Sequence, residues 1–194
     1  MKYDVIVVGG GSAGSVVAAR VAEDPNKTVL LLEAGNDYPD LSNLPVDIQF
    51  GHTKGAEDVN SPHNWALRGT ITEEQGEIHV AQGKVIGGGG SINGQVFLRG
   101  IPQDFDDWES WGNEEWSYTK VLPFYRKMET DLDIKDDFHG TEGPLPITRK
   151  LNETIPVIQS AFQTACLQNG YDTTDDMNGT NPTGIGMVAM NNQN

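Results

Sequence analysis

Residues 3–14, with the sequence YDVIVVGGGSAG, decide the fold of this chain. The apolar run at 3–8 predicts a buried parallel strand that leads straight into a G-x-G-x-x-G turn. A helix-forming stretch follows at 15–23, and a second apolar strand is expected at 29–32, just before Glu33. The order strand, glycine turn, helix, strand and acid predicts a dinucleotide-binding βαβ unit.

Each glycine of the turn has its own physical reason. Gly9 permits a tight turn, Gly11 lets the backbone approach a pyrophosphate because it lacks a Cβ, and Gly14 lets the helix pack closely on the strand. Ser12 and Ala13 belong to the same turn. It leads into the helix, whose free N–H groups and positive dipole end face the phosphates. At the end of the second strand, the Glu33 carboxylate can accept hydrogen bonds from ribose hydroxyls and would repel a 2′-phosphate.

Composition excludes several classes of partner. The chain has 194 residues and a formal net charge of −15, which argues against nucleic acid and anionic membranes as partners. No apolar run approaches the length of a transmembrane segment. Cys166 is the single cysteine, so no internal disulfide can form. Met1 leads almost directly into the first strand, so we expect no signal peptide and a cytoplasmic location.

The remaining sequence is less regular. Residues 36–76 lose the periodicity and carry several prolines and glycines, so we expect a long excursion of the kind that covers a cofactor. A short strand is predicted at 77–82, with His79 half-buried in it, and another around Leu145 and Ile147.

Three helices are expected after residue 100. Asp104 caps the first, Ser117 the second, which carries Pro123 in its second turn, and Asn152 starts the third. Gly170 lies just past the end of the third helix. The residues expected on one buried face of that helix are Ile155, Ile158, Ala161, Phe162, Ala165 and Cys166.

A second glycine cluster, at 87–90, is flanked by apolar residues. A flat ligand lying against the backbone would explain it, because only glycine lets the chain come that close; a flexible hinge is the simpler alternative. Together with 3–14 and the LLEAG at 31–35, the stretch 83–106 resembles the signature of the glucose–methanol–choline (GMC) oxidoreductases, which are FAD enzymes. The resemblance continues through 139–145, covers essentially the whole chain and is closest to choline-dehydrogenase-like members.

The resemblance implies a site and a reaction. It implies a Rossmann-like α/β domain that holds FAD, and hydride transfer from an alcohol carbon to flavin N5, with oxygen or a quinone-like molecule as electron acceptor. Ile92 occupies the position of the histidine to which some members attach FAD, so the cofactor is expected to be non-covalent. Gln82 stands where many members have arginine, and Gly89 and Gly90 replace small hydroxyl residues. The residues expected at the cofactor are Gly9, Gly11, Ser12, Ala13, Gly14, Glu33, Ala34, Trp65, Val85, Gly88, Asn93, Gly94 and Val96.

The catalytic base of the resembled family is a histidine near the C-terminus of much longer chains. The four histidines here, at 52, 63, 79 and 139, match no such motif, so no catalytic residue and no metal site are assigned. His139 is expected to make structural hydrogen bonds, and Cys166 to lie in the core.

The chain is therefore expected to be the N-terminal piece of a larger or split enzyme that needs a C-terminal segment or complementary chain. Its parts would be the first βαβ at 1–35, the excursion at 36–76, the signature and following helices at 77–150, and the start of a substrate-side region at 151–194. The leading function is the FAD-binding part of an alcohol-oxidising enzyme. The alternatives are a hydroxynitrile-lyase-like enzyme and a non-catalytic FAD-binding module. An NAD-dependent dehydrogenase is disfavoured because its fold has no use for the second glycine signature.

Overall fold

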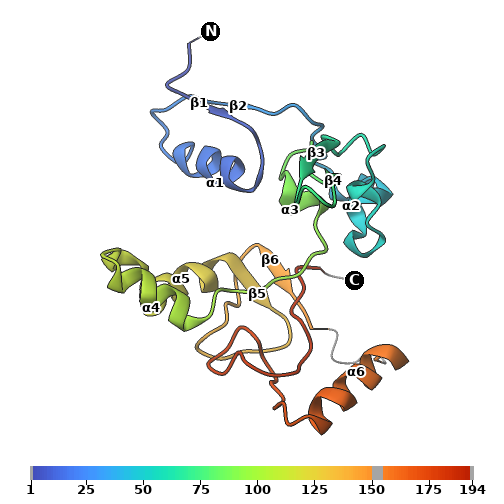
Figure 1. Cartoon of the computed structure of the whole chain (residues 1–194). Coiled ribbons are helices and arrows are strands. Elements are labelled where there is room, and N and C mark those ends of the chain that lie inside the picture. The colour runs from blue at the N-terminus through green and yellow to red at the C-terminus, as the bar shows by residue number, and fades with distance from the viewer. Residues whose placement is uncertain (1, 150–154, 193–194) are drawn as a thin grey trace. The chain divides into compact units, whose positions relative to one another are not determined.

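The computed structural model describes residues 2–149 and 155–192 (Figure 1). The chain separates into two compact units, residues 1–95 and 96–194. Each unit is described by itself below.

The first unit begins with the predicted βαβ arrangement. Strands β1 (Val5–Val8) and β2 (Val29–Leu32) pair in parallel, with Val5 opposite Val29 and Val8 opposite Leu32. Helix α1 (Ser12–Val21) lies beside them and begins three residues earlier than predicted, because the second half of the glycine turn already has helical geometry (Figure 1). The α/β class with a partial Rossmann-like domain is thus confirmed.

Short turns and one hairpin make up the rest of the first unit. The predicted strand is present as β4 (Glu77–Val80), which pairs antiparallel with β3 (Leu67–Thr70). The sequence analysis missed β3 and was wrong about His79, which is exposed. A small core lies behind the second glycine cluster, where Val85 packs with Ala56 and Ile92. The other elements are η1 (Leu41–Asn43), α2 (Val46–Gln49), η2 (Gly51–Thr53), η3 (Gly55–Glu57) and α3 (Gly89–Ile92).

The second unit contains the expected helices with shifted starts. Helix α4 (Pro102–Ser110) begins two residues before Asp104, since Pro102 suits a first helical position; the Asp104 carboxylate accepts from the Ile101 N–H at 3.1 Å. Helix α5 (Tyr118–Met128) starts directly after Ser117 as predicted, although the Ser117 hydroxyl makes no cap hydrogen bond. The short turn η4 (Glu114–Trp116) joins them.

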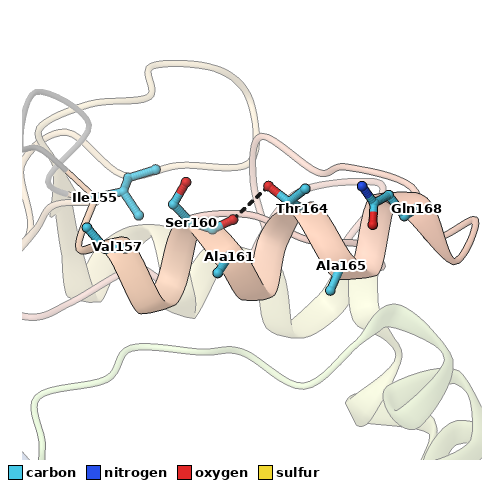
Figure 2. A pocket seen from close by; sticks show the side chains of 7 residues that line it. All are labelled: Ile155, Val157, Ser160, Ala161, Thr164, Ala165 and Gln168. Atoms are coloured by element: carbon cyan, nitrogen blue, oxygen red, sulfur yellow. Dashed lines mark hydrogen bonds between the residues drawn. The ribbon is translucent and has the colours of Figure 1, made fainter.

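Helix α6 (Val157–Gln168) differs most from expectation. It begins after Pro156, and the predicted start at Asn152 lies outside the described residues. Gly170 follows its end with φ +82°, as predicted. The predicted buried face is wrong: Ile158 and Phe162 are 80% and 68% exposed, and Cys166 is only partly buried. Figure 2 shows the shallow depression along this helix, lined by Ile155, Val157, Ser160, Ala161, Thr164, Ala165 and Gln168.

Two short parallel strands organise the second unit. Strand β6 (Leu145–Ile147) confirms the prediction, and its partner β5 (Glu129–Asp131) was missed. The sequence Glu-Thr-Asp looks like a surface turn, yet both acids of β5 are fully buried. Their burial depends on cationic side chains brought from elsewhere in the same unit.

Apolar surface remains open on the first unit. Within the described residues the β1–β2 sheet has only these two strands, and the side chain of Val8 is 82% exposed. No described helix is both long enough and apolar enough to cross a bilayer.

Candidate functional site

The first glycine turn is tightly folded. Gly9 has φ +95°, which favours glycine, and a Cβ added to Gly14 would lie 1.9 Å from the Gly9 carbonyl oxygen. The steric reasons predicted for these two glycines are therefore confirmed. At Gly11 the nearest atom to an added Cβ is the Gly88 Cα, 3.9 Å away, so a small side chain here would make only an ordinary van der Waals contact.

The second glycine segment lies directly on the first turn. The Gly87 N–H donates to the Gly10 carbonyl at 2.7 Å, and the Ser12 hydroxyl donates to the Gly87 carbonyl at 3.3 Å. A Cβ on Gly88 would come within 2.7 Å of the Gly11 Cα. The two segments, residues 9–14 and 87–90, form what we call the glycine cradle. A close approach of chain to chain therefore explains Gly88, a reason that the sequence analysis did not see.

Part of the cradle remains open. Nothing lies within 4 Å of a Cβ built on Gly89 or on Gly94. The first N–H groups of α1 have no partner inside the helix, and this end of the helix lies at the surface. The cradle therefore presents main-chain donors and glycine backbone to a ligand, a surface suited to a pyrophosphate.

The Glu33 side chain holds the glycine turn through two main-chain hydrogen bonds. One carboxylate oxygen accepts the Gly10 N–H at 2.7 Å and the other accepts the Gly35 N–H at 2.8 Å. The N–H of Gly35 foremost, helped by that of Gly10, lowers the pKa of Glu33 against the effect of burial. A half-buried carboxylate of this kind keeps lone pairs for a further donor such as a ribose hydroxyl.

The segment leading to the second glycines is held from two sides. The Lys84 N–H donates to the His63 carbonyl at 2.7 Å, and the Ile86 N–H donates to the Asn36 carbonyl at 3.0 Å. Val85, between them, is 2% exposed, so only its main chain can meet a ligand. Ile92 is buried in the same small core.

The other predicted residues are more scattered. Trp65 is 47% exposed, with the Lys84 ammonium 5.1 Å from its ring centroid. The Asn93 side-chain oxygen accepts the Gln95 N–H at 2.8 Å, and Ala34 is exposed. Val96 belongs to the second unit, where it bridges to Met190. The first unit thus brings together the glycines, Ser12, Ala13 and Glu33, while the places of Trp65, Asn93 and Val96 at a cofactor stay predictions.

One side-chain network of the first unit was missed by the sequence analysis. The buried His63 contacts Asp47 through Nδ1 and Tyr38 through Nε2, each at 2.7 Å. No sequence motif joins these three residues, since only the fold of the excursion brings them together.

The second unit holds a buried charge cluster, defined as Arg99, Glu129, Asp131, His139, Arg149 and Asp176. His139 lies at its centre, with Nδ1 3.0 Å from Asp131 and 3.1 Å from Glu129, and Nε2 2.8 Å from Asp176. The predicted hydrogen-bonding role of His139 is confirmed, although the sequence did not reveal its partners.

The arginines complete the cluster. Arg99 donates to Glu129 at 2.7 Å, and Arg149 donates to both Asp131 and Asp176 at 2.8 Å. Three carboxylates thus face two guanidinium groups and one imidazole, and the charges balance when the imidazole carries a proton.

Electrostatics favour that protonated state. Burial alone would lower the pKa of His139, but its hydrogen bonds to Asp131, Asp176 and Glu129 outweigh burial and raise it to about 11. Burial alone would raise the pKa of Asp176, but the hydrogen bonds from His139, from the Asn178 N–H and from Arg149 outweigh burial and lower this pKa to about 2. Glu129, Asp131 and His139 lie as close together as metal ligands. An imidazolium has no lone pair for a metal, so this group is an internal ion network.

Comparison with known proteins identifies the family of the chain. The family model described as GMC oxidoreductase matches residues 3–194. A GMC-type oxidoreductase of Rhodococcus erythropolis is 37% identical over 97% of this chain and 37% of its own length. An oxygen-dependent choline dehydrogenase of Yersinia pseudotuberculosis is 41% identical over 96% of this chain and 33% of its own length.

Solved structures of two oxidases share the fold of this chain. Pyridoxine 4-oxidase from Mesorbium loti matches with a TM-score of 0.85 and 31% identity, over 99% of this chain and 37% of that protein. A formate oxidase matches with a TM-score of 0.77 and 29% identity, over 97% and 34%. The chain spans about a third of the length of these relatives. The chain therefore belongs to the GMC oxidoreductase family, and FAD is confirmed as the cofactor that the resemblance implied.

Proposed function

We propose that this chain holds FAD in the glycine cradle and forms the N-terminal, cofactor-binding part of an enzyme that oxidises the CH–OH group of a small alcohol. The observation that carries the proposal is the contact between the two glycine segments, with Gly87 bonded to Gly10 and Gly88 against Gly11. The contact leaves room for an added atom at Gly11, where α1 begins, and open space at Gly89.

The nucleotide half of FAD would be bound by the first segment. Gly9 shapes the turn, and the main chain from Gly11 through Ser12 and Ala13 to Gly14 offers the N–H groups of the helix start to the pyrophosphate. Glu33, ionised and half-buried, would accept hydrogen bonds from the adenosine ribose, with Ala34 beside it.

The flavin half would be bound by the second segment. We place it along the main chain of Val85 and Gly88, with Asn93, Gly94 and Val96 further along and Trp65 at the side. The excursion at 36–76 would cover the cofactor, and residues 151–194 would begin the substrate side. The attachment is non-covalent in this proposal, because Ile92 carries no nucleophile and its side chain lies in the core.

The chemistry follows from the cofactor. Bound FAD can accept a hydride from the carbon of an alcohol, while this chain binds and orients it. Choline dehydrogenase and pyridoxine 4-oxidase, the names of two relatives, describe enzymes whose substrates carry such a CH–OH group. We assign the catalytic base to a complementary C-terminal region, and the electrons pass on to oxygen or a quinone-like acceptor.

FAD titration of one glycine variant and one control variant tests the proposal. In Gly11→Ala the added Cβ meets only an ordinary contact at 3.9 Å, so the fold should tolerate it while a pyrophosphate would not. We expect the FAD Kd to rise at least about tenfold, which corresponds to ~1.4 kcal/mol. Ala22→Ser is the matched control, because it also adds a single side-chain atom, but at an exposed residue at the far end of α1 and outside the cradle.

The measurement is a native mass spectrum of each purified chain with added FAD. The wild type and Ala22→Ser should carry one FAD that is lost on denaturation, and Gly11→Ala should lose it under native conditions. A wild-type chain that takes up no FAD, or equal binding by all three chains, would contradict the proposed site.

A further inference from the structure

Asp47, His63 and Tyr38 form a linear relay of hydrogen bonds inside the first unit. The Asp47 carboxylate lies 2.7 Å from His63 Nδ1, and His63 Nε2 lies 2.7 Å from the Tyr38 hydroxyl. The relay is anchored at both ends, because the Ser61 hydroxyl donates to Asp47 at 2.9 Å and the Asn36 amide donates to the Tyr38 oxygen at 3.1 Å. His63 is 3% exposed.

The partners fix the direction of the relay. Burial would raise the pKa of Asp47, but the bonds from His63 and Ser61 outweigh it and lower that pKa, so the carboxylate is ionised and only accepts. Nδ1 of His63 must then be a donor. Since Asn36 already donates to the Tyr38 oxygen, we assign the Tyr38 hydrogen to Nε2 of His63.

His63, at the centre of the relay, and Asn36, which bonds to its Tyr38 end, both hold the segment that leads to the second glycines. The His63 carbonyl accepts the Lys84 N–H at 2.7 Å, and the Asn36 carbonyl accepts the Ile86 N–H at 3.0 Å. One residue later, Gly87 bonds to Gly10 in the cradle.

The neighbours of the relay add to this hold. The Asn64 side-chain oxygen accepts the Gln82 N–H at 3.1 Å, and the Trp65 N–H donates to the Gln82 carbonyl at 2.9 Å. The Tyr38 ring packs against the core that contains Val85. The excursion thus forms hydrogen bonds with residues 82, 84 and 86 of this segment.

We propose that His63 is a positioning residue for FAD binding: through Asp47 and Tyr38 it fixes its own main chain and that of Asn36, and thereby sets the place of Gly87 and Gly88 on the first glycine turn. The inference rests on the proposed function of the cradle. It assigns no chemistry to His63 itself, whose side chain is buried and bonds to Asp47 and Tyr38.

Two variants break the relay while keeping its shape. His63→Asn retains a donor toward Asp47 but no longer reaches Tyr38. Tyr38→Phe keeps the ring in the core and removes only the hydroxyl. The matched controls are His79→Asn, at an exposed histidine of β4, and Tyr171→Phe, at a tyrosine that is 65% exposed.

Amide hydrogen exchange of the FAD-free full chain is the first readout, because it does not depend on the cofactor. We expect the amides of Lys84, Ile86 and Gly87 to exchange about tenfold faster in His63→Asn and Tyr38→Phe, with the β1 amides and both controls unchanged. Unchanged exchange at these three amides would overturn the proposal. So would an equal rise across β1, because that would indicate general unfolding.

FAD titration of the same variants is the second readout. We expect the Kd to rise about tenfold in both relay variants and not in the controls, with a changed visible circular dichroism of the bound flavin. Loosened amides with an unchanged Kd would overturn the link between the relay and FAD. A wild-type chain without FAD would contradict the proposed function, while the exchange result would still decide whether the relay holds the cradle.

Discussion

His63 in the first unit and His139 in the second are both buried, and they have different surroundings. His63 contacts one carboxylate and one phenol, so its relay contains a single carboxylate. His139 contacts three carboxylates, which two arginines also contact. Both side chains are almost fully removed from solvent.

The difference shows two ways to bury a polar side chain. A relay with one partly exposed carboxylate has little charge to desolvate, so single groups can be changed at modest cost. A balanced cluster of six charged groups is stable only when complete, because removing one leaves its partner charged and unpaired in the interior. We therefore expect the second unit to be a rigid scaffold and the first to tolerate adjustment near the cofactor.

Arg149→Met should strongly destabilise the second unit. It leaves Asp131 and Asp176 facing an imidazolium alone, and breaking a buried pair in this way costs about 3–5 kcal/mol. Urea unfolding followed by tryptophan fluorescence reports on this unit, which holds Trp108, Trp111 and Trp116.

Arg68→Met is the control for that experiment. Arg68 pairs with Glu77 on the surface, its side chain is 58% exposed, and its loss should cost less than about 1 kcal/mol. Similar losses in the two variants would show that the charge cluster is not the scaffold that its burial indicates.

The stability of the second unit should also depend on pH. The pKa of His139 is raised in the fold to about 11 from an ordinary 6.5, so its contribution is complete below pH 6.5 and is lost as the pH rises toward 11. Asp176, with its pKa lowered to about 2 from 3.8, contributes fully above pH 3.8 and loses this contribution as the pH falls toward 2.

Between pH 7 and 8 the free energy of unfolding should fall by about 1.4 kcal/mol, the effect of one proton. Urea unfolding at several pH values measures the slope, and NMR titration of the imidazole signals identifies its origin. A His139 signal that titrates near pH 6.5 would contradict the assignment.

The same substitution in the two networks sharpens the comparison further. Asp47→Asn keeps the shape of the relay and replaces a partly exposed carboxylate, so it should cost about 1 kcal/mol. Asp131→Asn removes a fully buried charge between Arg149 and His139 and should cost several times more.

Global hydrogen exchange of the slowest amides in each unit gives both free energies from one preparation. A cost of Asp47→Asn that equals or exceeds that of Asp131→Asn would mean that the relay is as strictly coupled as the cluster.

Local patterns explain which parts of the fold could be predicted. The β1–α1–β2 unit was predictable because apolar runs and the glycine turn encode it within some thirty residues. Strand β5 was not, because Glu-Thr-Asp is buried only through Arg99, Arg149 and His139, which come from distant positions. Gly88 was recognised as important, but its contact with Gly11 depends on a fold that no single segment reveals.

Helix α6 shows the limit of periodicity. The spacing of Ile158, Phe162 and Ala165 correctly predicted a helix, and the same spacing predicted a buried face that the described chain does not bury. An amphipathic pattern records that a face is apolar; what covers that face is set by tertiary packing.

Ile158→Lys should therefore have the smallest effect of all. The Ile158 side chain is 80% exposed on α6, so the free energy of unfolding should change by less than about 0.5 kcal/mol. The binding of a hydrophobic dye should nevertheless decrease, because the apolar face is broken by a charge. Ile147→Lys, at a fully buried position of β6, is the contrasting variant and should unfold the second unit. If Ile158→Lys were as damaging as Ile147→Lys, the face of α6 would be buried in solution, and the second unit would owe part of its stability to contacts other than the charge cluster.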